Sequence, residues 1–169
     1  ALLYRPARPE VAVSFNASLG RASVVLLAVC VGVTGATSRR ATEQIQTDDN
    51  VRPAGTLRDN VTLGLAYPGD DRVMAAAELT GLSRLIAAHP LGIDLPISEG
   101  GRGLSGGQRV LTGLTRLMLS QPRLWLLDEP TANLDVQTEA NVLAALQKNV
   151  APNATMIMVT HKLQLLSLV

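Results

Sequence analysis

The 169-residue sequence has only one cysteine and almost no net charge. Its single cysteine, Cys30, cannot close an internal disulfide, and the sequence has no cluster of cysteine and histidine that could hold zinc. Fifteen basic residues balance fourteen acidic ones, leaving a formal net charge of +1. Bulk charge therefore does not favour a surface for nucleic acid or anionic membrane. The hydrophobic fraction of 47% is that of a globular domain and excludes a wholly disordered chain.

Lysine and aromatic residues are also scarce. The only lysines are Lys148 and Lys162, so the first 147 residues contain none. The aromatic residues are Tyr4, Phe15, Tyr67 and Trp125. A site that requires a lysine ammonium group must therefore take it from the carboxyl end of the chain.

Long hydrophobic runs are missing too. The longest uncharged run, residues 22–38, has seventeen residues, whereas a membrane-spanning helix needs roughly 18–20 apolar ones. Its many valines favour a buried strand followed by a loop over the alternative of a transmembrane helix. Residues 1–10 carry two arginines and two prolines where a secretory signal needs an apolar segment, so no signal peptide is expected.

Helical and strand-like patterns alternate along the second half of the chain. Helices are expected over residues 71–89 with a break at Gly81, from near Ser105 onward, and over residues 135–149. Between them, short apolar runs predict strands that are buried on both faces, as in a parallel sheet covered by helices. This alternation predicts an α/β fold.

The two predicted strands are residues 124–127 and residues 156–159, and each is followed by polar residues. Residues 39–54 and 91–103, rich in polar residues or glycine and proline, are expected to be loops. In open α/β sheets, ligands bind at the carboxyl ends of the strands. The residues at those two ends are therefore the first candidates for a functional site.

Asp128 and Glu129 follow the first strand, and His161 follows the second. Two such carboxylates can divide their work: the first holds Mg²⁺, and the second orients or deprotonates a water molecule that attacks phosphorus. Taken alone, the acidic pair before Pro130 is better explained as a solvated turn.

A second candidate, the segment Ser105, Gly106, Gly107 and Gln108, stands at the start of the predicted helix. Consecutive glycines at a helix N-terminus let bare backbone N–H groups approach a phosphate, and the helix dipole adds positive potential. Ser105 supplies a hydroxyl and a helix cap. Taken alone, this segment is also a common kind of loop.

Together these blocks resemble the nucleotide-binding domain of ATP-binding cassette (ABC) transporters. Residues 104–109 resemble the signature motif, residues 124–135 the Walker B strand with the D-loop, and residues 160–162 the switch-histidine motif. Residues 55–60 and the region before the signature resemble exporters, most closely bacterial type I secretion exporters. The resemblance implies a P-loop NTPase-like layered sheet with a helical subdomain, here incomplete.

Three domains follow from the resemblance. Residues 1–54 would be a degenerate N-terminal part of the nucleotide-binding core, and residues 55–103 the helical subdomain. Residues 104–169 would hold the signature helix, Walker B strand, D-loop and switch histidine. Just before the signature, Glu99 and Arg102 are either contacts to a transmembrane partner or part of a solvated loop.

The resemblance implies ATP and Mg²⁺ as cofactors, with Asp128 as the metal ligand and Glu129 and His161 as catalytic residues. Two such domains close head to tail around two ATP molecules. The residues implied to bind ATP held by the partner are Ser105, Gly106, Gly107, Gln108 and Asp135. The implied partners are a second nucleotide-binding domain and the transmembrane domains of an exporter, at the cytoplasmic face of the inner membrane; no nucleic acid is implied.

The phosphate-binding loop of this family, G-x-x-x-x-G-K-[ST], departs from its pattern here. Residues 32–39 keep Gly32 and Gly35, but Ser38 stands where lysine belongs, and the first lysine of the chain is Lys148. A nearby arginine is a planar fork and no equivalent of a compact ammonium. Loss of one such group costs on the order of a hundredfold or more in rate, so little or no ATP hydrolysis is expected from this chain by itself.

Three interpretations remain open. The chain is the ATPase domain of an exporter, in a truncated or divergent copy; or a catalytically defective cassette that completes a partner's ATP site; or a non-functional fragment whose first fifty residues are not native cassette sequence. Signature-bearing DNA-repair and chromosome ATPases are a more distant alternative, because they contain long coiled coils and this chain has no heptad tract.

Overall fold

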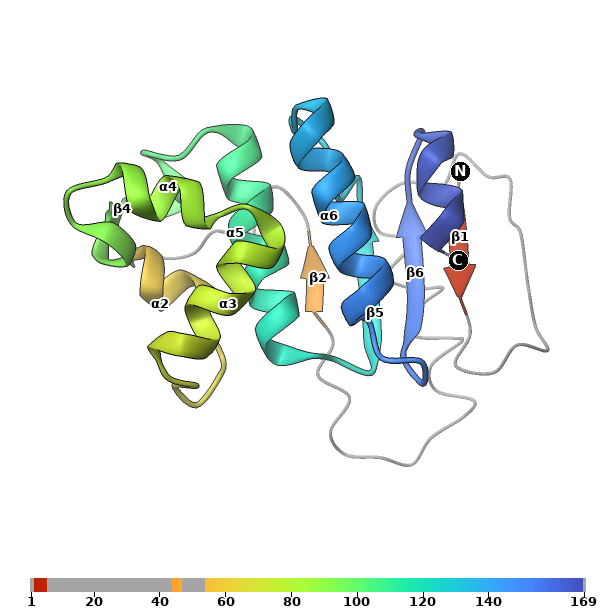
Figure 1. Ribbon diagram of the computed structural model, residues 1–169, viewed down its shortest axis with the longest axis horizontal. Coiled ribbons are helices and arrows are strands. Elements are labelled where there is room, and N and C mark those ends of the chain that lie inside the picture. The colour runs from red at the N-terminus through yellow and green to blue at the C-terminus, as the bar shows by residue number, and fades with distance from the viewer. Residues whose placement is uncertain (1, 6–43, 47–53, 169) are drawn as a thin grey trace. The chain divides into compact units, whose positions relative to one another are not determined.

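The computed structural model describes residues 2–5, 44–46 and 54–168, which form parts of two compact units (Figure 1). Unit 1 comprises Ala1–Ile45, Pro122–Glu129 and Ala151–Val169, and unit 2 comprises Gln46–Gln121 and Pro130–Val150. The predicted strand within residues 22–38 and the candidate phosphate loop at residues 32–39 lie outside the described residues. The domain boundaries at residues 54 and 103 stay a prediction.

A four-stranded sheet has the order β1-β6-β5-β2 (Figure 1). The strands are β1 (Leu2–Arg5), β2 (Gln44–Gln46), β5 (Leu124–Asp128) and β6 (Thr155–Val159). β5 and β6 are parallel, with Leu124 opposite Thr155 and Asp128 opposite Val159, whereas β1 pairs antiparallel with β6. The two apolar runs are therefore neighbouring parallel strands, as the sequence predicts.

β2 corrects one expectation, because residues 39–54 were expected to be loop throughout. Residues 44–46 form a strand at one end of the sheet order. The strand is only three residues long and carries one apolar residue, Ile45, between two glutamines. That is too little alternation for a sequence pattern to distinguish a short end strand from a loop.

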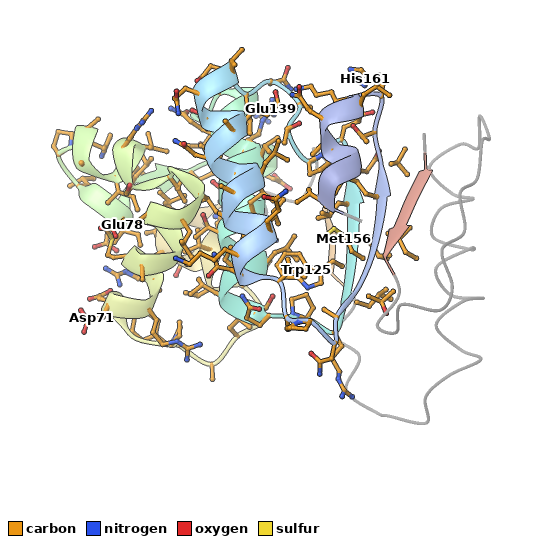
Figure 2. All side chains as sticks on the ribbon, turned by 45° about the vertical axis from the view of Figure 1, so that its right-hand side comes forward. Asp71, Glu78, Trp125, Glu139, Met156 and His161 are labelled. Carbon is orange, nitrogen blue, oxygen red and sulfur yellow. The ribbon has the colours of Figure 1, made fainter. Side chains whose placement is uncertain are left out.

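The core of unit 1 is built by the middles of β5 and β6. Trp125, Leu127, Met156 and Met158 are all at most 2% exposed. Trp125 and Met156 stand opposite each other in the register (Figure 2). Each fully buried side chain of this size stabilises the fold by about 1.5–3 kcal/mol relative to its exposed state. On the other face of the same strands, Leu126 and Ile157 are each 3% exposed. Burial of both faces holds the carboxyl ends of the two strands in fixed positions.

Unit 2 is mainly helical. Its helices are α2 (Leu57–Val61), α3 (Asp70–Thr80), α4 (Ser83–Ala88), α5 (Gly106–Ser120) and α6 (Val136–Asn149). Two short antiparallel strands, β3 (Gly55–Thr56) and β4 (Pro96–Ile97), and the 3-10 helices η1 (Gly92–Asp94) and η2 (Glu99–Gly101) complete it. A third 3-10 helix, η3 (Leu163–Leu168), follows β6 in unit 1.

The predicted helix break at Gly81 is confirmed. Gly81 has a φ of 85° and ends α3, and α4 then runs to Ala88, two residues before Pro90. Glycine adopts this left-handed conformation without the steric cost that a Cβ atom brings. The break lets α3 and α4 pack against each other as separate helices.

Helix α5 is the centre of unit 2 and packs against α2 and α3. Leu114 and Leu117 are almost fully buried, and the hydroxyl groups of Thr115 and Thr80 form a hydrogen bond of 2.7 Å between α5 and α3. Arg116 is also buried, and its Nε and Nη2 donate to the Asn60 carbonyl oxygen at 2.8 and 2.6 Å. Apolar packing and buried polar contacts together fix the direction of α5.

On the surface of unit 2, Arg58 connects three segments of the chain. Its guanidinium contacts the carboxylates of Asp94 and Asp70, and it donates to the Tyr67 hydroxyl at 2.7 Å. The hydrogen bonds from Asp94 and Asp70 raise the pKa of Arg58 further above its ordinary value. Arg58 therefore stays charged at every accessible pH and holds the loop before α3 close to α2.

Among the helices that the structure describes, none combines the length and the apolar composition that a membrane crossing requires.

Candidate functional site

One candidate site lies in unit 1, where β5 and β6 end side by side. The backbone N–H of Glu129 donates to the Val159 carbonyl oxygen at 2.9 Å and so continues the parallel ladder one residue past Asp128. Glu129 and His161 consequently leave neighbouring strands at the same edge of the sheet. This edge is where open α/β sheets bind ligands.

Glu129 and His161 are in direct contact. The Glu129 Oε1 lies 2.9 Å from Nδ1 of His161 and accepts a hydrogen bond of 3.1 Å from the His161 backbone N–H. The Thr160 hydroxyl donates to Oε2 in a longer contact of 3.4 Å. The Glu129 side chain is 33% exposed and that of His161 is 77% exposed. The carboxylate is therefore held in one orientation. The imidazole of His161 stays open to a ligand (Figure 2).

This arrangement suits a proton-transfer pair. When the Glu129 carboxylate accepts a hydrogen bond from the protonated Nδ1 of His161, the other ring nitrogen, Nε2, is left to meet a ligand. A carboxylate fixed at a strand end can orient a water molecule or take a proton from it. The sequence predicts both residues at the site, and the structure brings them together.

Glu129 also has an unusual backbone, with a φ of 46°. This left-handed conformation is uncommon for a residue other than glycine or asparagine and costs roughly 1–2 kcal/mol. Such strain gathers at functional sites, where the surrounding structure enforces it. The sequence alone does not reveal this turn, because no local residue preference predicts it for a glutamate.

Asp128, the predicted Mg²⁺ ligand, is the last residue of β5 and is half-buried. Within residues 2–5, 44–46 and 54–168, no three His, Cys, Asp or Glu side chains lie together as a metal-binding group. Mg²⁺ commonly binds through one or two carboxylates, with water and substrate phosphate as its other ligands. One carboxylate at the strand end therefore fits a magnesium ion that arrives with a nucleotide, and its role stays a prediction.

A separate candidate site lies in unit 2, at the start of α5. The Ser105 hydroxyl accepts a hydrogen bond from the Gln108 backbone N–H at 3.2 Å, and the Gln108 side chain accepts one from the Ser105 backbone N–H at 2.8 Å. This capping box fixes the turn in which Gly106 and Gly107 lie. The predicted helix start at Ser105 is confirmed.

The two glycines lie directly against Asn133. A Cβ atom on Gly107 would be 2.7 Å from the Asn133 backbone oxygen, and one on Gly106 would be 3.1 Å from the Asn133 side-chain nitrogen. A Cβ at 2.7 Å is not tolerated without movement of the neighbouring backbone. Asn133 itself has a left-handed φ of 59°, a conformation that asparagine tolerates. Packing within this chain therefore requires glycine at position 107 and leaves little space for a side chain at position 106. The sequence alone does not reveal this reason.

Asp135 is the N-cap of α6, as predicted. Its carboxylate accepts hydrogen bonds from the Thr138 backbone N–H at 2.9 Å and from the Thr138 hydroxyl at 2.6 Å. These bonds, that of the hydroxyl foremost, lower the pKa of Asp135 below its ordinary value. Asp135 is exposed, and its contact with a partner's ATP stays a prediction.

Glu99 and Arg102, the candidate coupling residues, lie in and next to η2. The Ser98 backbone N–H donates to the Arg102 carbonyl oxygen at 3.1 Å, which closes a short turn. Both Glu99 and Arg102 are exposed. Their position agrees with a solvated loop, and a coupling role stays a prediction.

Comparison with known proteins identifies the family. The family model described as ABC transporter matches residues 23–132, which is well over half of the chain. The chain belongs to the ABC transporter family.

The relatives of this ABC transporter chain include bacterial transport and secretion proteins. The glutathione/L-cysteine transport system ATP-binding/permease protein CydC of Haemophilus influenzae is 38% identical over 109 residues, which cover 64% of this chain. The cyclolysin secretion/processing ATP-binding protein CyaB of Bordetella pertussis is 31% identical over 133 residues, which cover 79%. A solved structure of a bacterial Atm1-family ABC exporter with ATP bound matches with a TM-score of 0.62 and 31% identity over 69% of this chain.

These comparisons confirm the α/β fold of the ABC ATPase and the resemblance to exporters. They also show that the matched relatives are much longer. The aligned part is 19% of CydC and 18% of CyaB, and it covers 20% of the exporter chain of known structure. What the longer proteins do as wholes passes to this chain only as a proposal.

Proposed function

We propose that this chain is the ATP-binding and ATP-hydrolysing domain of an ABC-type exporter, which couples ATP hydrolysis to transmembrane transport in the manner of type I secretion. The observation that carries the proposal is the contact between Glu129 and His161 at the ends of two parallel strands. In a member of the ABC transporter family, this pair would direct a water molecule to attack the terminal phosphate of ATP.

Each residue at the strand ends has a proposed task. Glu129 orients the attacking water and accepts its proton, and His161 holds the carboxylate while its open ring nitrogen meets the terminal phosphate. Asp128 would hold Mg²⁺, which supplies positive charge to the phosphate oxygens when bound. The oxygen donor at the end of β5 supports this assignment.

The residues of unit 2 have a proposed task toward a second nucleotide-binding domain. Their backbone and side-chain groups would contact ATP that the partner holds; they are Ser105, Gly106, Gly107, Gln108 and Asp135. The backbone N–H groups at the start of α5, a helix of fifteen residues, favour a negatively charged ligand. We place the assembly, with its transmembrane domains, at the cytoplasmic face of the inner membrane.

A second function is favoured by the lack of lysine before Lys148. A cassette without the phosphate-loop lysine would bind its own ATP poorly but could still complete the ATP site of a competent partner. In this version the chain is a non-catalytic or regulatory subunit. The groups around Ser105 would then be the working part, and those around Glu129 would serve a pocket without a phosphate grip.

Mixing this chain with an intact exporter nucleotide-binding domain tests both versions. We expect the chain to raise the ATPase rate of the intact domain, and we expect Ser105→Arg to remove the gain because the bulky cation fills the signature turn. Ala87→Arg is the matched control, since it adds the same side chain at an exposed position of α4. Absence of a gain at every mixing ratio would contradict the proposal and favour a non-functional fragment.

A further inference from the structure

Glu139 is a buried carboxylate for which the proposed function has no task. It lies in the first turn of α6 and is only 5% exposed (Figure 2). Burial of a carboxylate is costly unless hydrogen bonds compensate it. Here the Thr131 hydroxyl, itself 1% exposed, donates to Glu139 Oε1 at 2.9 Å. A buried acid and a buried hydroxyl therefore connect α6 to the segment before it.

That segment, residues 130–134, lies within the stretch that resembles the Walker B strand with the D-loop, and we name it the bridging loop. Its beginning is held by Glu139 through Thr131, and its end passes into Asp135, which caps α6 through Thr138. Within the loop, the Leu134 backbone N–H contacts the Thr131 carbonyl oxygen at 3.4 Å. The first turn of α6 thus anchors both ends of the bridging loop.

The bridging loop in turn meets the signature turn. Asn133, near the end of the loop, leaves no space for a Cβ atom on Gly107 and little for one on Gly106. The contact at Gly107 is made by the backbone oxygen of Asn133, so a change of the Asn133 side-chain rotamer cannot relieve it. A shift of the bridging loop must therefore displace the backbone at the start of α5.

We propose that Glu139 is a positioning residue for the signature glycines. By holding Thr131 it sets the bridging loop, and the loop sets the backbone of Gly106 and Gly107 through Asn133. Glu139 itself touches no nucleotide. The consequence for catalysis rests on the proposed function, in which the N–H groups of these glycines meet ATP; the mechanical connection does not.

The mechanical connection is tested on the full chain by amide hydrogen exchange. Thr131→Val removes the hydroxyl and keeps the shape, whereas Thr131→Ser keeps the donor. We expect Thr131→Val to raise the exchange rates of the Gln108 and Arg109 amides, which bond to Ser105, by about tenfold. Thr131→Ser should leave them near the wild-type rates.

A destabilising variant on the same helix provides the control. Leu146→Ala removes a fully buried side chain of α6 that belongs to no part of the bridging loop. It should raise exchange across unit 2 without singling out Gln108 and Arg109. Equal effects of Thr131→Val and Leu146→Ala on these two amides would overturn the proposal. Glu139→Gln, whose amide oxygen can still accept from Thr131, should resemble Thr131→Ser.

The catalytic consequence is tested in the mixture with an intact exporter domain. We expect Thr131→Val to lower the maximal ATPase gain several-fold while the amount of chain for half-maximal gain stays the same, because positioning changes the rate and not the association. If the wild-type chain gives no gain, the proposed function fails and the exchange experiment alone decides the role of Glu139. If the wild type gives a gain and Thr131→Val changes neither the gain nor the exchange, the positioning role is wrong.

Discussion

Among single residues, Ser105 has two tasks that can be measured separately. It caps α5 within a reciprocal pair of hydrogen bonds with Gln108, and in the proposed function it also meets nucleotide. We predict that Ser105→Ala lowers the free energy of unfolding by about 1 kcal/mol, since the first turn loses its acceptor, and that Ser105→Gly lowers it by a few tenths. Urea titration measures both values, and equal stability of all three proteins would contradict the cap.

The hydrogen bonds of Asp135 predict how stability depends on pH. Because the Thr138 hydroxyl and backbone N–H favour the charged carboxylate, its pKa in the folded chain lies below the ordinary value of 3.8. Its contribution to stability is therefore complete above that value and is lost as the pH falls through the lower, folded pKa. We predict that Asp135→Asn is less stable than the wild type at pH 7 and that the difference narrows below pH 3.8. Thermal unfolding at several pH values measures this difference, and a gap that widens in acid would contradict the assignment.

Between elements, the buried hydroxyl pair of Thr80 and Thr115 joins α3 to α5. Removal of one hydroxyl takes the cross-helix partner from the other, which keeps a carbonyl acceptor on its own helix. The loss of the cross-helix bond therefore costs about 0.5–1.5 kcal/mol. We predict that Thr80→Val and Thr115→Val are non-additive, with a coupling of about 1 kcal/mol in a double-mutant cycle. The free energies of unfolding of the four proteins give this value.

Thr112 is the control for that cycle. It is fully buried on the same helix and, like Thr115, bonds at 2.8 Å to a carbonyl oxygen of its own helix, here that of Gln108. The cross-helix bond of Thr80 is made to Thr115 and not to Thr112. Thr80→Val and Thr112→Val should therefore add to within about 0.5 kcal/mol. A coupling as large as that of the Thr80 and Thr115 pair would show that the effect is not specific to the cross-helix bond.

The long, strongly patterned elements could be predicted from the sequence, and the short ones could not. The strands predicted at residues 124–127 and 156–159, the helix break at Gly81 and the starts of α5 and α6 are confirmed, because each depends on local composition and a recognisable cap or stop. The sequence predicts loop at β2 because the segment is short and polar. Its pairing with β5 depends on residues far away along the chain.

The same division applies to the site. Glu129 and His161 could be placed together because the carboxyl ends of parallel strands meet at one edge. The left-handed turn at Glu129, the contact of Asn133 with the glycines and the bond of Glu139 to Thr131 could not. These features are set by tertiary packing, which leaves no periodic signal in the sequence.

At the scale of the whole molecule, the lack of a phosphate-loop lysine predicts that this chain by itself hydrolyses little or no ATP. We expect the purified chain with Mg²⁺ and ATP to release phosphate no faster than its Glu129→Gln variant, because the phosphate-loop segment has no lysine to stabilise the phosphates as charge moves in the transition state. An intact exporter domain, assayed beside it, should lose its turnover when its own catalytic glutamate is changed to glutamine. Magnesium-dependent turnover by this chain that Glu129→Gln abolishes would contradict the prediction, although it would strengthen the assigned role of Glu129.

The positive φ of Glu129 limits how this position can change over evolutionary time. β-branched residues such as valine, isoleucine and threonine are strongly disfavoured in that conformation, whereas glycine, asparagine and aspartate accept it. If a descendant of this protein were no longer selected for hydrolysis, substitutions at position 129 would still favour glycine or small polar side chains. The left-handed backbone at position 129 would thus restrict the residues found there even after the catalytic activity had been lost.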